Sequence, residues 1–403
     1  MSGPERARGG DARHERPRGG DGTDARKRRT YAAPSADGDM DDRVREHAEV
    51  LVDWSARVEA GDQVVMNVAE GAHDLAVAVA EEVGKRDATL LTTYGSGEVG
   101  RAFLRAGDDD REFAHSEPEL AMLEAADVHL SIGGGRNTTA LADVDGRRRQ
   151  RSRTATTETR EARMDTDWVS TVHPTRSLAQ QAGMAYEKYR EFVYDAVLRD
   201  WESLADGMAN MKEVLDAGSE VHIETERTDL TMSIENRTAV NSAASVAYDS
   251  HNLPSGEVFT APHATEGEVF FDVPMTIDAT RVSGVSLAFE DGEVVEFAAE
   301  QGEDAIADVL DTDAGARRLG ELGIGMNRGI DRFTDSILFD EKMGDTVHLA
   351  LGRAYDSCLP EGEAGNESAV HVDMITDVSE DSRLLVDGEV VQRNGTFRWE
   401  AGF

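Results

Sequence analysis

The sequence has 403 residues, which is too long for one hydrophobic core and predicts two domains. Its 80 acidic residues outnumber 42 lysines and arginines and give a formal net charge of −38, so its surface would repel itself strongly in dilute buffer. Long periodic apolar segments and several strand-like runs argue against an acidic disordered chain.

Molar salt would screen this repulsion, because the Debye length falls to about 3 Å. We therefore expect a cytoplasmic protein of a halophile, a cell that accumulates salt. The single cysteine, Cys358, cannot form an internal disulfide, which fits a reducing cytoplasm. No apolar run approaches about 18 to 20 residues, and the N-terminus lacks the apolar core of a signal peptide. We expect no membrane partner.

Residues 1–39 are rich in Gly, Arg, Asp and Pro and carry almost no large apolar side chain. This composition is typical of a disordered segment. We expect a dispensable tail, or an upstream extension of a chain whose native start is Met40. The alternative is a basic arm for nucleic acid at residues 26–29, but the prediction for the protein is that it has no nucleic-acid partner.

From residue 41 to residue 217, helical and strand-like patterns alternate, which predicts an α/β domain with a mostly parallel sheet and right-handed crossovers. The expected elements are a helix over 43–58, a strand over 63–68, a helix over 72–83, a strand over 88–93, a helix over 117–126, a strand from 128, a strand over 168–172 and a mostly helical segment over 178–217. The stripe in that last segment that includes Tyr186 and Tyr189 is expected to be core.

Two stretches of this domain permit a second interpretation. The run Gly133-Gly134-Gly135 follows a strand but lacks the spacing of a dinucleotide-binding loop, so a tight turn at the carboxyl edge of the sheet is favoured. A nucleotide-dependent oxidoreductase is the less favoured alternative. The basic run 147–153 is expected to be a solvated helix face or a loop; the alternatives are a nucleic-acid patch or a contact with an acidic partner subunit.

Residues 218–403 are predicted to form an α+β, strand-rich metal-binding domain. Strands are expected over 220–224, 230–235, 268–273 and 284–290, with a hairpin at residues 291–292 and a short helix over 304–310. The last third of the chain, from residue 252 to residue 373, collects side chains that suit two adjacent divalent ions, namely three carboxylates, two imidazoles and a phenol. These candidates are Glu257, Glu321, His348, Tyr355, His371 and Asp373.

The local patterns agree with a metal site. His371 and Asp373 share one face of an expected strand, and His348 lies on the polar face of a second strand expected to be half-buried. Glu257 follows a turn whose Gly256 permits unusual backbone angles, and it begins a strand that would aim the carboxylate. Because a histidine in such a strand is also commonly an ordinary core or surface residue, spacing alone leaves both interpretations open.

The segments 252–262 and 320–373 resemble the aminopeptidase T / PepS family of dinuclear metalloaminopeptidases. The similarity extends from about Met40 to the C-terminus and includes the pattern Asn366-x-Ser368-x-x-His371. The chain departs from the family at Val372, where Trp is frequent, and at Cys358 in a variable loop. Both departures concern substrate fit.

The resemblance implies peptide substrates with a free N-terminus, a homodimer, and two divalent ions of zinc, cobalt or manganese. It places those ions on Glu257, Glu321, His348, His371 and Asp373, with Tyr355 at or beside them as a further ligand and catalytic residue.

We expect Glu341 to be the general acid or base, because one carboxylate near the ions must be free to carry protons. The alternative for Glu341 is an ion pair with Lys342 or Arg353. The predicted function is that of a metalloaminopeptidase, and a non-catalytic protein that binds metal or peptide is the principal alternative.

Overall fold

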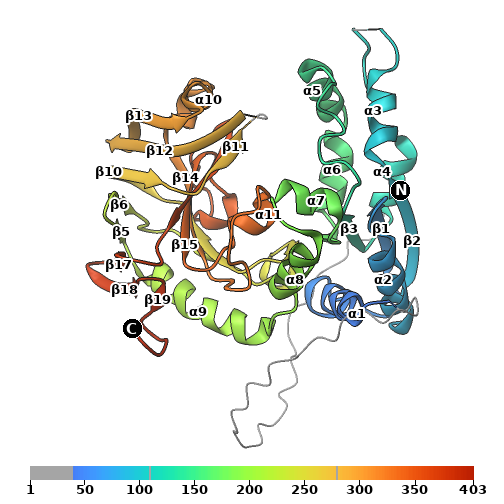
Figure 1. Cartoon of the computed structure of the whole chain (residues 1–403), viewed down its shortest axis with the longest axis horizontal. Coiled ribbons are helices and arrows are strands. Elements are labelled where there is room, and N and C mark those ends of the chain that lie inside the picture. The colour runs from blue at the N-terminus through green and yellow to red at the C-terminus, as the bar shows by residue number, and fades with distance from the viewer. Residues whose placement is uncertain (1–39, 109, 278–279) are drawn as a thin grey trace, which may run out of the picture. The chain divides into compact units, whose positions relative to one another are not determined.

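In the computed structural model, the first half of the chain contributes four strands to a five-stranded parallel sheet in the order β2-β1-β3-β4-β8, and the short strand β8 comes from the second half (Figure 1). The structure describes residues 40–108, 110–277 and 280–403, so the segment expected to be a tail, 1–39, lies outside the described residues. The strands are β1 (Gln63–Ala69), β2 (Thr89–Gly95), β3 (Val128–Gly133), β4 (Asp167–Val172) and β8 (Asn252–Leu253). Every pairing among them is parallel, which confirms the sheet predicted from the alternation.

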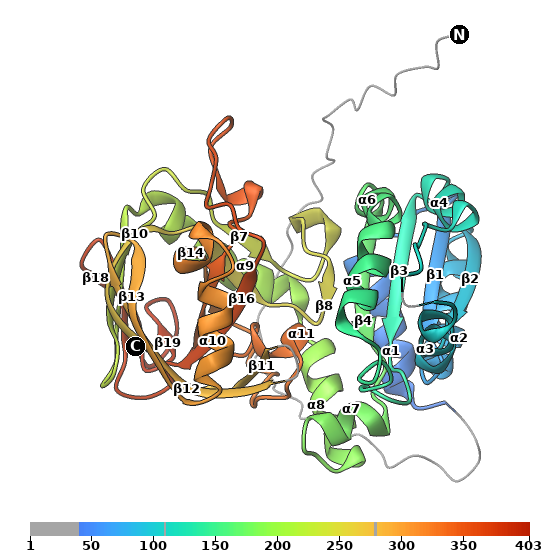
Figure 2. The ribbon, with the colours of Figure 1, turned by 90° about the horizontal axis from the view of Figure 1, so that it is seen from above.

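Helices precede, connect or follow these strands in the chain, and several of them lie beside the sheet (Figure 2). They are α1 (Asp42–Glu49), the π-helix η1 (Val50–Ser55), α2 (His73–Lys85), α3 (Gly97–Arg105), α4 (Glu117–Glu124), α5 (Gly146–Ala155), α6 (Thr157–Met164), α7 (Arg176–Gln181) and α8 (Tyr186–Val197). None of the helices in the described ranges combines the length and apolar character needed to cross a membrane.

The basic run 147–153 lies in helix α5, and a helix was one of the two predicted structures, the other being a loop. Asp145 caps this helix by accepting a hydrogen bond from the Arg148 backbone amide at 3.0 Å. Most side chains of the run are exposed or half-exposed, but Arg148 is buried and donates to the carbonyl of Asp108 at 2.8 Å. One arginine of the run therefore ties α5 to the loop after α3.

The sheet and its helices enclose one hydrophobic cluster. Val64, Met66 and Leu130 from the strands pack with Val79 of α2 and Val193 of α8. Tyr189 is also buried in this cluster, which confirms the prediction that the tyrosine-containing stripe is core.

At the carboxyl edge of the sheet, Gly134 has a φ of 129°. A Cβ added at Gly71 would lie 2.2 Å from the Gly134 carbonyl oxygen, so the glycine run makes a close-packed turn.

Helix α9 (Trp201–Ala217) leads into a nine-stranded sheet in the order β11-β12-β10-β6-β5-β17-β18-β19, with β13 paired to β12. Its pairings are antiparallel, and β12 and β13 are joined by the predicted hairpin at Asp291 and Gly292, which have φ values of 52° and 77°. The strands are β5 (Glu220–Glu224), β6 (Asp229–Ser233), β10 (His263–Phe271), β11 (Met275–Ile277), β12 (Thr280–Glu290), β13 (Glu293–Gln301), β17 (Arg383–Val386), β18 (Glu389–Arg393) and β19 (Thr396–Phe397).

A third sheet, in the order β16-β15-β14-β9-β7, is also antiparallel and carries the candidate ligands. Its strands are β7 (Val240–Ser242), β9 (Glu257–Thr260), β14 (Leu319–Gly325), β15 (Thr346–Gly352) and β16 (His371–Asp377). The remaining helical segments are α10 (Glu303–Leu310), α11 (Ile337–Asp340) and the short 3-10 turns η2 (Val246–Tyr248), η3 (Ala314–Arg317) and η4 (Asp356–Cys358).

The expectation that the strand around His348 is half-buried is wrong. Every residue of β14 and β15 is buried. These strands lie inside the sheet, with β9 and β16 as their outer neighbours, and the face that carries polar side chains is covered as well. The polar face of β15, which carries His348, is therefore shielded from solvent.

The two sheets of the second half share a hydrophobic cluster that includes Met208 of α9, Phe271 of β10 and Leu322 of β14. The first cluster also takes in Leu253, Phe339 and Ile375 from the second half. The division into domains at residues 217 and 218 stays a prediction.

Candidate metal centre

Glu257 begins strand β9 at the point where the chain leaves a tight turn. Gly256 has a φ of 118°, and a Cβ at this position would lie 2.7 Å from Cβ of Asn327, so glycine is required on both counts. Pairing with Gly325 of β14 and Ser242 of β7 fixes the strand on both sides. The Glu257 side chain, which is 8% exposed, is thereby held inside the protein.

Glu321 and His348 come together from adjacent strands. His348 lies opposite Gly323 in the register of β15 and β14. A Cβ at Gly323 would lie 2.0 Å from the His348 ring, so only glycine leaves room for the imidazole. His348 Nε2 lies 3.3 Å from Glu321 Oε1 and 3.7 Å from Glu257 Oε2. Two carboxylates from two strands therefore face one nitrogen.

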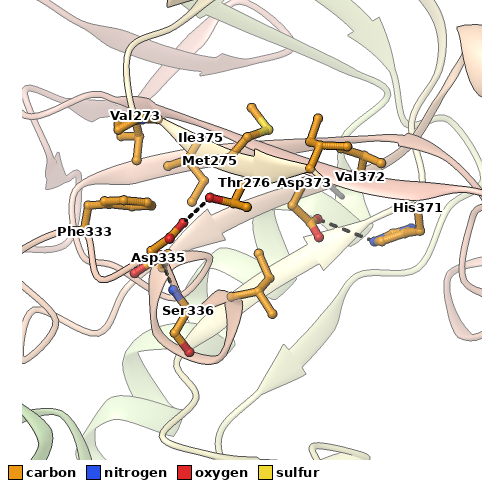
Figure 3. A pocket seen from close by; sticks show the side chains of 14 residues that line it. Val273, Met275, Thr276, Phe333, Asp335, Ser336, His371, Val372, Asp373 and Ile375 are labelled. Atoms are coloured by element: carbon orange, nitrogen blue, oxygen red, sulfur yellow. Dashed lines mark hydrogen bonds and ion pairs between the residues drawn. The ribbon is translucent and has the colours of Figure 1, made fainter. Parts of the chain in front are cut away.

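His371 and Asp373 lie on the same face of β16, as their spacing predicts. His371 Nε2 is 3.1 Å from Glu321 Oε2 and 3.5 Å from Asp373 Oδ1, the second contact being visible in Figure 3. His371 Nδ1 lies 2.8 Å from the carbonyl oxygen of Arg353. Because a carbonyl only accepts hydrogen bonds, Nδ1 is the protonated nitrogen that donates there. This bond orients the ring and turns Nε2 toward the carboxylates.

These side chains fit a divalent cation. The ligand atoms of Glu321, His371 and Asp373 all lie within 4.8 Å of one another. In a neutral His371 ring the Nε2 lone pair would face carboxylate oxygens, which are also acceptors, and a cation between them resolves that conflict. Within the described ranges, Glu257 Oε2, His348 Nδ1 and Asp373 Oδ1 are buried without a hydrogen-bond partner. Mixed carboxylate and imidazole donors suit zinc, cobalt or manganese.

The carboxylates shape the pKa values of the site. Burial raises the pKa of Glu257, and the nearby charges of Lys342 and His348 only partly offset it. Burial also acts to raise the pKa of Glu321, but hydrogen bonds from His348 and His371 outweigh it and lower that pKa to about 2. Burial acts to lower the pKa of His371, but the bonds to Asp373 and Glu321 raise it to about 11. Concentrated negative charge therefore favours cations at this site.

Tyr355 lies at the edge of this group. Its ring centroid is 5.0 Å from that of His371 and 5.5 Å from that of Phe259, and the residue is 47% exposed. Partial burial, and then the charges of Glu321 and Asp373, raise the pKa of Tyr355, so its phenol stays protonated. The structure thus places Tyr355 beside the candidate ligands, where it covers His371.

Glu341 forms an ion pair with Lys342, which is the alternative that the sequence leaves open for this residue. Lys342 is fully buried, and its Nζ also lies 3.3 Å from Glu257 Oε1. Sequence reasoning missed the approach of Lys342 to Glu257. The available signal was a lysine within a segment that already carries two carboxylates, Asp340 and Glu341.

The pattern that ends at His371 has a supporting role. Asn366 Nδ2 donates to the carbonyls of Gly315 at 2.8 Å and Gly352 at 2.6 Å. Ser368 Oγ donates to Asp313 at 2.8 Å. These bonds fix the loop that leads into β16 and so set the position at which His371 enters the site.

A cavity of about 260 Å³ opens beside His371 and Asp373. Its wall contains both apolar and polar side chains, and Figure 3 shows Phe333 and Val273 at the end away from His371. Asp335 also lies on this wall, where it accepts a hydrogen bond from Thr276 Oγ1 at 2.9 Å and lies 3.5 Å from Arg281. The side chains that line the cavity include Val273, Met275, Ile277, Phe333, Val372 and Ile375.

A mixed α/β fold that gathers three carboxylates and two imidazoles next to a cavity is suited to a metal-dependent hydrolase. Residues 40–397 match the model of the family described as thermophilic metalloprotease (M29), and the chain belongs to this family.

Named relatives agree with this assignment. Aminopeptidase T of Thermus thermophilus is 28% identical over 384 residues, which cover 85% of this chain and 93% of the relative. Aminopeptidase AmpS of Bacillus subtilis is 26% identical over 414 residues, which cover 88% of this chain and 98% of the relative. The solved structure of wild-type AmpT from Thermus thermophilus has a TM-score of 0.79 at 26% identity and covers 89% of this chain and 100% of that chain.

These comparisons confirm three predictions. The family resemblance and the mixed α/β fold class are correct. The enzyme class, a metalloaminopeptidase that hydrolyses peptide bonds, is correct as well. The chain is therefore a metal-dependent peptidase.

Proposed function

We propose that the protein releases N-terminal amino acids from peptides with a free N-terminus, using two divalent ions of zinc, cobalt or manganese. The observation that carries the proposal is the position of Glu321 between two imidazoles. Its Oε1 faces His348 Nε2 at 3.3 Å, and its Oε2 faces His371 Nε2 at 3.1 Å. A carboxylate that faces two histidines through different oxygens is suited to bridge two ions.

The other candidate ligands divide between two positions. Glu257 lies with His348 on one side of Glu321, at 3.7 Å between Oε2 and Nε2. Asp373 lies with His371 on the other side, at 3.5 Å between Oδ1 and Nε2. Each metal position would thus have one imidazole, one carboxylate and one oxygen of Glu321 as ligands.

The bound ions would lower the pKa of a water molecule and polarise the scissile carbonyl. The chain supplies the other functions. The carboxylates of Glu257 and Asp373 would hold the ions, one at each position. The protonated phenol of Tyr355, whose ring lies beside that of His371, is our candidate to donate a hydrogen bond to the substrate. Glu341, which forms an ion pair with Lys342, is our candidate to accept a proton.

The cavity beside His371 would receive a substrate side chain. Its wall of Val273, Met275, Phe333, Val372 and Ile375 suits an apolar group, and its volume of about 260 Å³ suits a side chain of leucine or phenylalanine size. Apolar N-terminal residues are therefore the expected substrates.

We also propose a homodimer in the cytoplasm of a salt-accumulating cell. The edge strand β2 and the helix α3 that follows it carry exposed apolar side chains, although an aqueous surface disfavours such a patch. Leu91, Tyr94, Val99 and Phe103 are 49%, 57%, 69% and 55% exposed. An open strand edge with adjacent apolar groups suits pairing with a second copy.

The test compares a peptide that has a free N-terminal leucine with the same peptide after N-acetylation. Protein treated with a chelator is reloaded separately with zinc, cobalt or manganese, and released leucine is measured. We expect release from the free peptide alone and only with metal. Binding of the peptide without release would instead indicate a non-catalytic protein, and equal release from the acetylated peptide would refute the aminopeptidase proposal.

A further inference from the structure

Lys342 places a positive charge inside the candidate metal centre. The residue is fully buried, its Nζ lies 3.3 Å from Glu257 Oε1, and it forms an ion pair with Glu341. A buried ammonium group is costly unless carboxylates compensate it, and here two of them do. One of these carboxylates, Glu257, is also a candidate ligand.

Hydrogen bonds fix the backbone around Lys342 and keep the residue beside the turn that precedes Glu257. Asp340 accepts hydrogen bonds from the backbone amides of Thr334 at 2.8 Å and Ser336 at 2.9 Å. The Lys342 carbonyl accepts from the Asn327 amide at 3.2 Å. Asn327 is itself buried and donates through Nδ2 to the Ser255 carbonyl at 2.8 Å, which ties Lys342 to the turn before Glu257.

The opposite side of the centre has a different charge balance. Glu321, His371 and Asp373 form the compact ligand group described above. Within the described ranges, no lysine or arginine forms an ion pair with Glu321 or Asp373, whose charged partners are the two histidines. The negative charge on this side remains available to a cation.

We propose that Lys342 makes the two metal positions unequal, so that the position at His371 and Asp373 binds its ion tightly and the position at Glu257 and His348 binds weakly and exchanges. This inference rests on the proposed two-ion centre. A second cation at Glu257 must share that carboxylate with Lys342 and is repelled by the ammonium group. Because Lys342 and Glu257 are both buried, this repulsion should persist in concentrated salt.

The consequence concerns how the enzyme is loaded. Protein isolated without added metal keeps one ion per chain, and the second ion is taken up only when free metal is supplied. Full activity then depends on the free metal concentration, because the weak position is filled and emptied while the tight position stays occupied.

The test counts ions without relying on activity. Chelated protein in molar potassium chloride is titrated with manganese by calorimetry, and retained metal is measured by mass spectrometry of the elements after gel filtration. We expect one retained ion per chain and a second binding step at least tenfold weaker. Lys342→Met removes the charge and keeps similar length, so it should strengthen the second step at least tenfold. Lys188→Met, at an exposed lysine paired with Glu191, is the matched control and should change neither step.

Ligand variants assign the two steps. Glu257→Gln should remove the weak step and leave one retained ion, whereas Asp373→Asn should remove the tight step. Two equal steps in the unmodified protein, or an unchanged ratio in folded Lys342→Met, would overturn the inference. If Lys342→Met does not fold by circular dichroism, the ratio in the unmodified protein and the two ligand variants decide alone. Failure to bind any ion would instead refute the proposed metal function.

Discussion

The imidazole of His348 lies against the backbone of Gly323, where a Cβ atom would come within 2.0 Å of the ring. His348 on β15 is paired with Gly323 on β14. The imidazole therefore fits only because residue 323 has no side chain.

Gly323→Ala should therefore displace His348 and weaken the whole site. Forcing a methyl group into a packed interior costs about 1 to 3 kcal/mol, so the melting temperature and the bound metal should both fall. Gly207→Ala in α9 is the control, because nothing lies within 4 Å of the added Cβ. Differential scanning calorimetry and metal analysis measure both effects, and a normal metal content in Gly323→Ala would contradict the prediction.

Glu257→Gln and His371→Ala should reduce peptidase activity to background while the fold persists. Each change removes a candidate ligand but empties little hydrophobic core. Metal content should fall by about one ion per chain in each variant if both positions are filled beforehand. Circular dichroism checks the fold, and turnover near the normal rate with full metal content would show that the assigned ligand is wrong.

Acid should destabilise the protein through the buried His129 of β3, which is not among the candidate ligands. Burial lowers the pKa of His129 from 6.5 to about 4. The unfolded chain therefore takes up a proton near pH 6.5 that the folded chain refuses, and stability is lost as the pH falls from about 6.5 toward 4. At pH 4 this one residue costs about 3 kcal/mol at most.

His129→Gln should then lose less stability than the unmodified protein over the same pH interval. Urea unfolding at pH 7.5, 6.0 and 5.0 in molar potassium chloride gives the two slopes. Since both proteins keep the same candidate metal ligands, loss of metal in acid affects both alike. Identical slopes would show that His129 is not protonated on unfolding.

Val372→Phe should fill part of the cavity beside His371. Activity on peptides that begin with phenylalanine should fall at least about tenfold in kcat/KM, while activity on peptides that begin with alanine should fall less, because a pocket discriminates by the volume that it can admit. Val295→Phe, at a position 49% exposed on β13, is the matched control. An equal loss for both substrates would indicate damage to the metal centre instead of a smaller pocket.

Removal of salt should act on the surface before it acts on the site. With a formal net charge of −38, exposed carboxylates repel one another once the Debye length grows beyond the spacing between charges. We expect loss of the dimer or the fold at millimolar salt, followed by loss of metal. Excess divalent ion should restore about 2.7 kcal/mol at a hundredfold excess over its dissociation constant.

Circular dichroism, sedimentation and activity, followed from molar to millimolar potassium chloride, measure the order of these events. A folded, dimeric and active protein in millimolar salt without added metal would refute the halophilic interpretation of the charge.

The sequence predicted the parts of the fold that depend on local patterns. The alternation of helices and strands correctly indicated a parallel sheet, and the spacing of His371 and Asp373 correctly put them on one face of β16. Burial of β15 on both faces was missed, because a strand's neighbours in a sheet are set by segments far away in the chain. Contact between Glu257 and Lys342 was missed for the same reason, since 85 residues separate them.

The pairing of strand β8 with β4 bears on which fragment of the chain could fold and bind metal. Residues Asn252 and Leu253 pair with Ser170 and Thr171 of β4, in the parallel sheet, only a few residues before Glu257 enters the ligand-bearing sheet. A fragment beginning at residue 218 would contain every candidate ligand and yet lack the strand that anchors this approach. We therefore expect truncation of the first sheet to leave residues 252–253 without their strand partners, while Glu257 keeps its own pairings with β7 and β14.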